Sequence, residues 1–367
     1  MKVLVLDGPA SLADAVASLP AAGPLPARTV LVPSERHAHA LRRALARSGR
    51  SAALAGTRFV GSLTAAIEVL RTAGVPFSTG EDALRPARLL ALFREDLRLE
   101  HFDLPLLRAT RGWEDAFAAA IGDLEAAGLS PADLPGEAAH ARDLAALWAR
   151  AGAEAGASFT DARAMLEAAA LLSREGAWAF DGPTLAIASG HEPAAQARFL
   201  AAIPGVVLGL RVARPAGARL LQRIERLYGP EARKAVERGR GPVALRPGAT
   251  ERDLLATYLF ADAKALADPG RPRSKGPDGS VDLDEHAGVE AELEAAAAWV
   301  SRQVLEARRP LEEIAILVPS LDPLAQLAAD RLERLPFEGG PLPVYVAGGL
   351  PAVATAAGAR VLAVLRA

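Results

Sequence analysis

The stretch VEAELEAAAAWVSRQVLEARRPLEEIAILVP, residues 289–319, joins a helix signal to a strand signal. Apolar residues recur at helical spacing through Ala296 and Val300, and the first turn is acidic, as the positive end of a helix favours. After a proline, the apolar run 314–318 is typical of a buried parallel strand. A second amphipathic helix follows, and then residues 343–346 and a glycine pair. The stretch therefore predicts alternating helices and strands.

The amino-terminal segment predicts the same alternation. Residues 3–6 form a short apolar run, and residues 11–19 have helical spacing with Ser11 as an N-cap candidate. Residues 29–32 are apolar and lead into a helix predicted at 35–46. Short apolar runs that alternate with helices are typical of an α/β domain built around a parallel sheet.

The middle of the chain changes to consecutive helices between residues 80 and 176, with no strand signal between them. The predicted helices are 86–98, 113–127, 138–155 and 161–173. The apolar runs 184–188 and 206–210 then return to strand character and would complete the first sheet. We interpret the helical block as an insertion into the first α/β domain. Further on, residues 217–241 are arginine-rich and predicted helical, and residues 281–283 are predicted to open a second domain.

The order of these segments resembles superfamily 1 helicases and is most similar to the AddB/RexB-type subunits of bacterial helicase-nucleases. Residues 29–45 (TVLVPSERHAHALRRAL) look like the strand and helix after the phosphate loop, and residues 59–70 like the next segment of the first motor domain. Residues 112–134 look like its helical insertion, and residues 184–210 like its Walker B region. Residues 289–319 look like the start of the second motor domain. The resemblance rests on the fixed order of these matches along the chain.

The resemblance implies an α/β fold in which a P-loop NTPase (RecA-like) parallel-sheet domain carries an all-helical insertion. The start of a second RecA-like domain would follow. Residues 1–79 and 177–245 would form the first RecA-like domain, and residues 80–176 the insertion. Residues 246–280 would be a linker, and residues 281–367 the start of the second domain. The pattern stops inside an early helix of that domain, so we expect a fragment of a longer protein whose nuclease domain lies further on.

Composition excludes several kinds of chemistry and partner. The chain has no cysteine, which excludes disulfides, cysteine nucleophiles and thiolate metal sites. Its net charge of −2 gives no overall basic field, so contact with nucleic acid would need clustered arginines. The opening residues do not read as a signal peptide, and no stretch of about 18 apolar residues predicts a membrane span. We therefore expect a cytoplasmic protein with no membrane partner.

The phosphate-loop position lacks residues that ATP hydrolysis requires. A working loop has the pattern G-x-x-x-x-G-K-[ST], in which backbone N–H groups cradle the phosphates, lysine reaches the β and γ phosphates, and the hydroxyl holds magnesium. The corresponding turn is Asp7, Gly8, Pro9, Ala10 and Ser11. It contains no lysine, and Pro9 removes an N–H donor. None of the chain's four lysines follows a glycine and precedes serine or threonine.

The Walker B position is also incomplete. The apolar strand 184–188 is followed by a turn with a single acid, Glu192, instead of an adjacent acidic pair. In active relatives an arginine follows the strand of the second domain, where this chain has Pro319. The expected degenerate nucleotide site comprises Asp7, Gly8, Pro9, Ser11, Gly190, His191 and Glu192. We expect no catalytic residue and no cofactor in this chain, with ATP and magnesium bound only by a partner subunit.

Neither a nuclease site nor a metal site is predicted. Nucleases of the PD-(D/E)xK type bring two acids and a lysine together on a strand around a metal. The D-x-K sequence at 262–264 has helical surroundings, so its two charged side chains would point about 200° apart. The acidic segment 282–286 is the most metal-like cluster, but we interpret it as a solvated loop. His37 and His39 lie two residues apart on a predicted helix and cannot face one metal.

Arginines gather in two segments that are candidates for DNA contact. One group includes Arg36 and Arg43, and the other spans residues 219–240. In superfamily 1 helicases, two loops that match this chain lie along the single strand, so the resemblance implies Ser34, Arg36 and Ser62 as DNA-binding residues. Arg43 joins them as part of the first arginine group. The alternative is that both groups are solvated helix faces.

These features together predict the non-catalytic, helicase-like region of a helicase-nuclease that processes DNA double-strand breaks. Its partners would be DNA, as a single strand or a duplex end, and a motor helicase-nuclease subunit that hydrolyses ATP. One alternative is a nucleotide-sugar-dependent transferase with two Rossmann-like domains, although that class does not predict the helical block. Another is a pure protein-interaction scaffold, which would bind neither DNA nor nucleotide.

Overall fold

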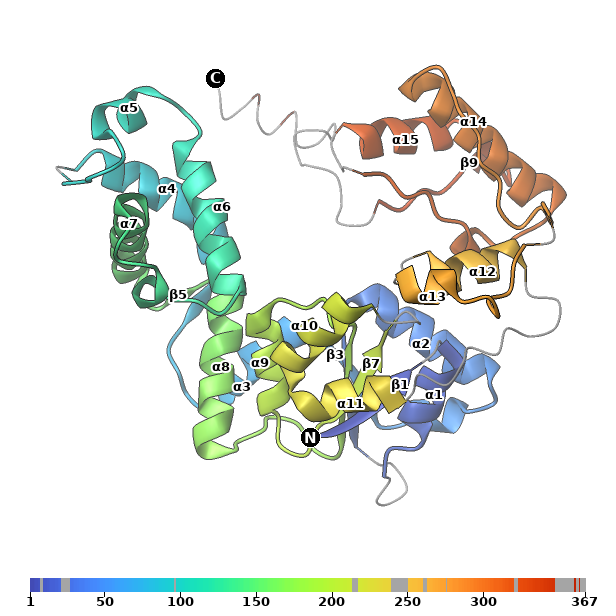
Figure 1. Ribbon diagram of the computed structural model, residues 1–367, viewed down its shortest axis with the longest axis horizontal. Helices are drawn as coiled ribbons and strands as arrows, with labels where there is room; N and C mark the ends of the chain where they lie inside the picture. Colours follow the sequence, from blue (N-terminus) through green and yellow to red (C-terminus); the bar gives the residue numbers. More distant parts are fainter. Residues whose placement is uncertain are drawn as a thin grey trace. The chain divides into compact units, whose positions relative to one another are not determined.

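The computed structural model describes residues 1–6, 9–20, 27–95, 97–212, 217–238, 250–259, 263–274, 276–319, 323–346, 360 and 363. The chain divides into two compact units, residues 1–278 and residues 279–367. Their helices and strands are labelled in Figure 1. The first unit contains an α/β part and a separate helical region, and the described part of the second unit contains helices, one short hairpin and irregular segments.

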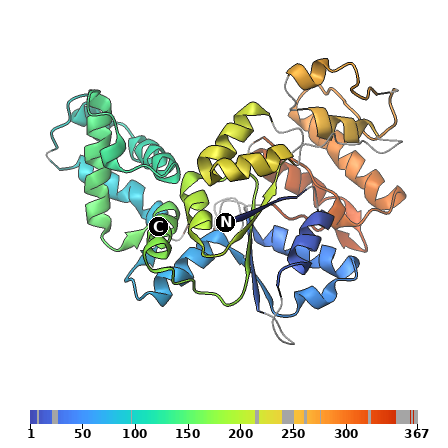
Figure 2. The same cartoon turned by 60° about the horizontal axis from the view of Figure 1, so that its bottom comes forward.

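A five-stranded parallel sheet forms the centre of the first unit. Its strands are β1 (Lys2–Leu6), β2 (Arg28–Val32), β3 (Thr57–Gly61), β6 (Thr184–Ala188) and β7 (Val207–Arg211). They lie in the order β1-β7-β6-β2-β3, and every neighbouring pair is parallel. The first strand is therefore at an edge, beside the last strand (Figure 2). The prediction of an α/β protein with a parallel sheet is confirmed.

The central strands are buried on both faces because each carries an unbroken apolar run. Val30 and Val32 of β2 pack on one face and Leu31 packs on the other, since successive side chains of a strand point to opposite faces. All five residues of β6 are buried as well. This pattern explains why the strand predictions at 29–32 and 184–188 are confirmed.

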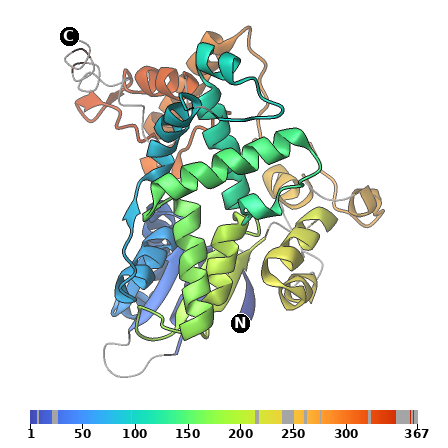
Figure 3. The same cartoon turned by 90° about the vertical axis from the view of Figure 1, so that its left-hand side faces the viewer.

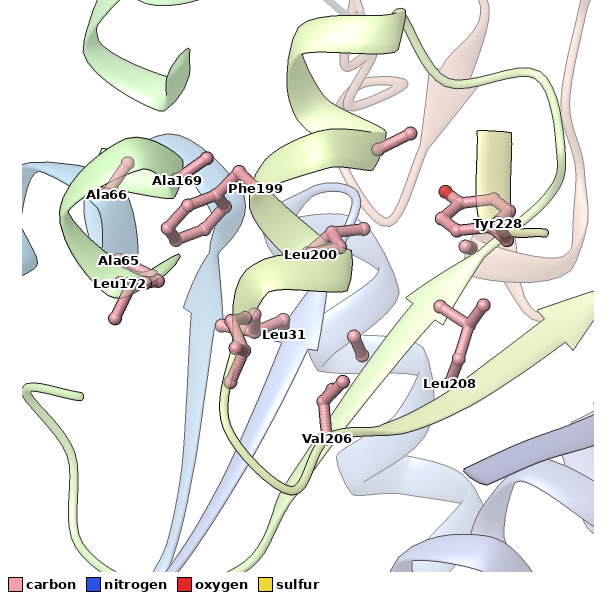
Figure 4. Packing of buried hydrophobic residues seen from close by; sticks show 14 of the residues in the cluster. Leu31, Ala65, Ala66, Ala169, Leu172, Phe199, Leu200, Val206, Leu208 and Tyr228 are labelled. Atoms are coloured by element: carbon pink, nitrogen blue, oxygen red, sulfur yellow. The ribbon is translucent and has the colours of Figure 1, made fainter. Parts of the chain in front are cut away.

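Helices cover both faces of the sheet. One face packs against α1 (Pro9–Ala17) and α2 (Glu35–Arg47). The other packs against α3 (Ser62–Thr72), α8 (Asp161–Glu175), α9 (Ala194–Ala202), α10 (Ala218–Tyr228) and α11 (Pro230–Arg238). Figure 4 shows this second core, in which Phe199 of α9 lies toward Ala66 and Ala169. Small residues on α3 and α8 therefore leave room for the large α9 side chain.

A separate helical region follows α3 in the chain. It contains α4 (Glu81–Phe93), α5 (Leu104–Ala109), α6 (Trp113–Ala126) and α7 (Ala139–Ala155). Its own core includes Phe93, Ile121 and Leu147. Two short parallel strands, β4 (Ser78–Thr79) and β5 (Ser158–Phe159), pair where the chain enters and leaves the region. The helices predicted from residues 113 and 138 are confirmed, because their apolar spacing matches this core.

The helical block differs from its prediction in three details. β5 interrupts it, although two residues are too few to give a strand pattern in the sequence. α8, predicted within the block, packs on the sheet through residues such as Leu172 and lies beside α9 (Figure 3). α4 spans Glu81–Phe93, so it begins before the predicted Pro86 and ends before the predicted Arg98. Its first turns bury Glu81 and Arg85, so they lack the apolar spacing that marks a helix.

One predicted helix boundary near the sheet is also wrong. α1 starts at Pro9, so Ser11 lies inside the helix and is not its N-cap, as we had predicted. Proline is favoured at the first helical position because its missing N–H would have no intrahelical partner there. The arginine-rich segment predicted as helical forms α10 and α11, which are separated by Gly229.

The remaining part of the first unit contains α12 (Glu251–Tyr258) and α13 (Ala263–Ala267), inside the segment predicted as a linker. Thr250 begins α12 with a capping box. Its hydroxyl accepts a hydrogen bond from the Asp253 N–H at 3.3 Å, and the Asp253 carboxylate accepts from the Thr250 N–H at 3.0 Å. Short 3₁₀ turns occur at Ser51–Leu54 and Pro131–Asp133.

The first helix of the second unit is the one that the sequence predicts from Val289. Its elements are α14 (Val289–Ser301), a π-helical turn (Arg302–Glu306), a 3₁₀ turn (Leu311–Glu313), α15 (Leu324–Leu332), β8 (Pro336–Phe337) and β9 (Gly340–Pro341). β8 and β9 form an antiparallel hairpin. The two predicted amphipathic helices of this unit are confirmed.

The buried strand predicted at 314–318 is wrong. These residues pair with no strand among the described residues, and Leu317 is 94% exposed. The segments 281–283 and 343–346 are likewise not strands. A parallel strand needs neighbours that take up its N–H and C=O groups, and the described residues of the second unit contain only the β8–β9 pair. An apolar run predicts a preference for burial but does not supply a pairing partner.

Candidate functional site at the carboxyl edge of the sheet

The carboxyl ends of the five parallel strands meet at one edge of the sheet, where several helices also begin. The register pairs Leu6 of β1 with Arg211 of β7. Extending the pairings of β7 with β6 and of β6 with β2 by a few residues brings Ser189 and Ser34 into the same row. Residues that are far apart in the sequence are therefore neighbours along this edge.

The connections leave this edge toward two faces of the sheet. α1 and α2 follow β1 and β2 on one face, whereas α3 and α9 follow β3 and β6 on the other. The neighbouring strands β2 and β6 therefore send the chain to opposite faces. Ligands of open α/β sheets bind outside the carboxyl ends of the strands at such a reversal. The loops after β2 and β6 are accordingly the candidate site.

The loop after β2 begins α2 at this edge. The Ser34 Oγ caps the helix: it accepts the His37 backbone N–H at 3.4 Å and lies 2.8 Å from His37 Nδ1. Burial, and then the nearby cations Arg211 and Arg36, lower the pKa of His37. Arg36 and Arg43 are exposed and seven residues apart, so they lie on one side of the helix. Three of the four DNA-binding candidates therefore belong to this one segment.

Ser62 reaches the same edge but is covered. It is the first residue of α3 and is 8% exposed. Its hydroxyl accepts a hydrogen bond from Gln196 Nε2 at 3.1 Å, which joins the start of α3 to α9. Direct contact between Ser62 and DNA would require this hydrogen bond to open.

The turn after β6 is closed by Glu192, which is 8% exposed. Its carboxylate accepts hydrogen bonds from the Ser189 N–H, the Ser189 hydroxyl at 2.9 Å, the Gly190 N–H at 2.9 Å and the Tyr228 hydroxyl at 2.9 Å. Burial and the adjacent carboxylate raise the pKa of Tyr228, which keeps its hydroxyl protonated as a donor. A Walker B acid must instead face magnesium and the attacking water. In this geometry Glu192 holds the turn.

Arg223 of α10 fixes the same turn from its other side. Its guanidinium donates to the carbonyl oxygens of Gly190 at 3.1 Å, His191 at 3.3 Å and Glu192 at 3.1 Å. Gly190 has a φ of 80°, and a Cβ there would lie 2.8 Å from an Ile224 side-chain carbon, so glycine is required. Contacts with α10 therefore determine the shape of the turn.

The phosphate-loop position is described in part. The predicted nucleotide-site residues of this loop are Asp7, Gly8, Pro9 and Ser11. The first two lie outside the described residues, and the last two belong to the first turn of α1. Lys2 starts β1 and therefore lies at the opposite edge, and Lys234 pairs with Glu231 on α11 at 2.8 Å. Of the lysine side chains that the structure describes, Lys2 is therefore away from this edge and Lys234 is already paired with a carboxylate.

The other candidate chemistries find no support in the described residues. These residues contain no group of three or more histidine, aspartate or glutamate side chains arranged to hold a metal. The acidic segment 282–286 is exposed and forms neither helix nor strand. Asp262 lies outside the described residues, and Ala263 begins α13, in agreement with the helical interpretation of the D-x-K sequence. Within the described ranges, no helix is long and apolar enough to cross a membrane.

Sequence reasoning missed Arg211 and Tyr228, and it placed Arg223 only in the arginine group of residues 219–240 as a candidate for DNA contact. The strand predicted at 206–210 could have identified Arg211 as a site residue, since the residue that follows a parallel strand lies at the carboxyl edge of the sheet. No sequence pattern could have assigned Arg223 and Tyr228 to this turn. They form hydrogen bonds with Glu192, which lies 31 and 36 residues before them in the chain. Only the packing of α10 against α9 brings them to it.

Comparison of the chain with protein-family models finds no matching family, and comparison with curated proteins finds no match. The strand order and the geometry of the carboxyl edge are therefore the structural basis for a functional proposal, together with the resemblance in the sequence.

Proposed function

We propose that this chain is the helicase-like region of an AddB/RexB-type subunit of a bacterial helicase-nuclease. Residues 1–245 hold a RecA-like domain with its helical insertion, whereas the described residues of 281–367 form no parallel sheet that would support the expected second RecA-like domain. The region binds DNA during the processing of double-strand breaks in the cytoplasm and does not itself turn over ATP. A partner motor subunit supplies ATP hydrolysis, and a further domain supplies the nuclease.

The arrangement of β1, β7 and β6 is the observation that best supports a helicase-like core. β1 precedes the phosphate-loop position and β6 precedes the Walker B position, far along the sequence. Both strands end at the same edge with only β7 between them. Neighbouring strands lie about 4.8 Å apart, so the two loops start roughly 10 Å from each other. That spacing suits two loops that evolved to share one nucleotide.

The strand order argues against the transferase alternative. Rossmann-like sheets start from a central strand, and their nucleotide binds at the end of that first strand. In this sheet the first strand lies at the edge. The helical region between β3 and β6 is a second feature that a simple pair of Rossmann-like domains does not need.

Two features support an inactive nucleotide site. The phosphate-loop position has no lysine, and its Pro9 offers no N–H to a phosphate. The only acid of the Walker B turn, Glu192, already accepts four hydrogen bonds from the protein. A site without a phosphate-binding lysine and without an available acid lacks both groups that would stabilise phosphoryl transfer.

The exposed arginines of α2 support DNA binding. Arg36 and Arg43 lie on one side of the helix, and Arg36 stands at the carboxyl edge beside the Ser34 cap. Arginines that neutralise backbone phosphates provide affinity without reading sequence. This is the behaviour expected of a subunit that guides a strand for a partner motor.

A phosphate-release assay with saturating single-stranded DNA tests the inactive-motor part of this proposal. The wild-type chain is expected to release phosphate no faster than the buffer background. Glu192→Gln is the internal control, because a contaminating ATPase is insensitive to it. Release above background that falls in a Glu192→Gln variant shown by circular dichroism to be folded would contradict the proposal, since the wild-type chain would then turn over ATP.

A further inference from the structure

A small polar cavity lies where the helical region joins the rest of the first unit. Its volume is about 20 Å³, and its lining includes Glu81 of α4, Ser158 of β5 and Thr160. Glu81 follows β4 closely in the chain, and Ser158 lies in β5, the strand that pairs with β4. The cavity is therefore beside both points at which the chain enters and leaves the helical region.

One carboxylate oxygen at this cavity is buried without a hydrogen-bond donor. Glu81 is 3% exposed, and its Oε1 accepts a hydrogen bond from Arg88 Nε at 2.8 Å. Its Oε2 is also buried, and no described residue donates to it. Burial of a carboxylate oxygen without a donor is costly, so buried oxygens of this kind are normally hydrogen-bonded. Glu81 Oε2 therefore marks a position for a ligand that can donate.

Two hydroxyl groups line the same cavity from the opposite side of the joint. Ser158 and Thr160 lie two residues apart in an extended segment, so their side chains point to one side, whereas Phe159 between them packs into the core beside the sheet. The Thr160 hydroxyl donates to Glu125 at 2.8 Å. A serine hydroxyl can both donate and accept. The cavity thus offers an acceptor on α4 and a hydroxyl on β5.

Size and charge together select the ligand. The cavity of about 20 Å³ exceeds the roughly 10–15 Å³ that one water needs and is far too small for an organic molecule. Each carboxylate at the cavity already has a cationic partner. Arg88 pairs with Glu81 at 2.8 Å, and Arg85 pairs with Glu125 at 2.6 Å. A metal ion would add charge to a balanced site, and an anion would face two carboxylates, so a small neutral donor fits best.

We infer that this cavity binds a structural water molecule, which donates a hydrogen bond to Glu81 Oε2 and forms a second with the Ser158 hydroxyl. Buried waters typically make two to four hydrogen bonds to polar groups that would otherwise lack a partner. This water connects the start of α4 to β5, and so it joins the two ends of the helical region. The site is independent of the proposed DNA-binding role.

Two variants of the full chain, Ser158→Ala and Ser158→Val, distinguish a hydrated cavity from a dry one. Alanine removes the hydroxyl but leaves room for the water. The methyl groups of valine take the place of the water and leave Glu81 Oε2 without a donor. Ser158→Val should therefore unfold at a lower urea concentration than Ser158→Ala. In a dry cavity the order would be reversed, because valine fills a void and has the higher strand propensity.

Ser78 provides the matched control, because it pairs in register with Ser158 but is exposed. Ser78→Val should be at least as stable as Ser78→Ala, since strand propensity alone separates these two variants. Circular dichroism establishes that each variant is folded. A Ser158→Val variant that is more stable than Ser158→Ala would overturn the inference.

Oxygen-17 relaxation dispersion of the solvent detects long-lived buried water directly. Its amplitude should fall by a single water molecule from wild type to Ser158→Val and should not change in Ser78→Val; an unchanged amplitude in Ser158→Val would contradict the inference. A crystal structure of the wild-type chain needs no variant. An ordered water within hydrogen-bond distance of Glu81 Oε2 supports the inference, and a dry cavity or a bound ion there overturns it.

Discussion

Glu192 lies in the turn after β6 at the carboxyl edge of the sheet, and its carboxylate is bound by the protein itself. Four donors converge on it, and Arg223 holds the backbone of the same turn. The sequence could identify the missing lysine and the missing second acid, because these are local absences. It could not identify the role of Glu192, because Tyr228 and Arg223 reach the turn only through the fold.

Glu192→Gln is expected to lower the free energy of unfolding by about 2 kcal/mol, because an amide nitrogen would face donors that now share a carboxylate. The midpoint of urea unfolding measures this loss. Glu175→Gln is the matched control, since Glu175 is exposed at the end of α8 and should change stability little. An unchanged midpoint for Glu192→Gln would mean that the carboxylate does not stabilise the turn.

At the scale of elements, hydrogen bonds between polar side chains hold the helices of the helical region together. Glu125 of α6 accepts hydrogen bonds from Arg85 of α4 at 2.6 Å, Trp148 of α7 at 3.0 Å and Thr160, the cap of α8, at 2.8 Å. One carboxylate thus joins three helices of the region to α8, the helix that follows the region and packs on the sheet. Removing one partner of such a buried network leaves the others unpaired, so the network fixes a single arrangement of these helices.

A second carboxylate, Asp143 of α7, organises the loop before α5. It is 3% exposed and accepts the backbone N–H groups of Glu100 at 2.9 Å, His101 at 2.8 Å and Phe102 at 3.1 Å. Burial alone would raise the pKa of Asp143, but these three donors hold it below its ordinary value of 3.8. The ionised form therefore stabilises the folded state.

Asp143→Asn is expected to cost about 1–3 kcal/mol near neutral pH, because one backbone N–H would lose its acceptor. The folded-state pKa is depressed, so the stabilisation is complete above 3.8 and is lost as the pH falls through the folded-state pKa. The difference in urea midpoint between wild type and variant should therefore shrink in acid.

Asp123→Asn is the control for this measurement, because Asp123 is exposed on α6. It should change the midpoint little at any pH. A wild-type advantage over Asp143→Asn that stays constant down to strongly acidic pH would contradict the assigned role of the carboxylate.

Helices and strands were predicted correctly where their residue pattern alone determines them. Strand prediction failed where the outcome depends on whether another strand is available for pairing. The run 184–188 is a strand because β2 and β7 pair with it on both sides. The run 314–318 is as apolar, yet no described strand pairs with it. The two-residue β5 has no pattern to detect, and its existence depends on β4. Strand prediction from a sequence therefore identifies residues that can be buried, and the fold decides which of them are paired.

At the scale of the whole molecule, one chain contains a parallel sheet with a separate helical region, and a second compact unit. Four of the five sheet strands of the first unit could be predicted from their apolar runs, whereas β3 was not predicted as a strand. The positive charge at the carboxyl edge could not be predicted, because Arg211 and Arg36 come from β7 and α2. The proposed role rests on this combination: a parallel sheet whose first strand lies at an edge, a turn after β6 whose acid is bound by the protein, and exposed arginines at the carboxyl edge.

The binding of the full chain to a labelled single strand, measured by anisotropy as salt is raised, tests the central claim most directly. We predict clear binding at low salt that weakens steadily with added salt, because arginines that contact phosphates release bound cations, with a slope of about −0.7 for each contact. Absence of binding even at low salt, or an affinity that does not depend on salt, would contradict the claim that this helicase-like region guides DNA.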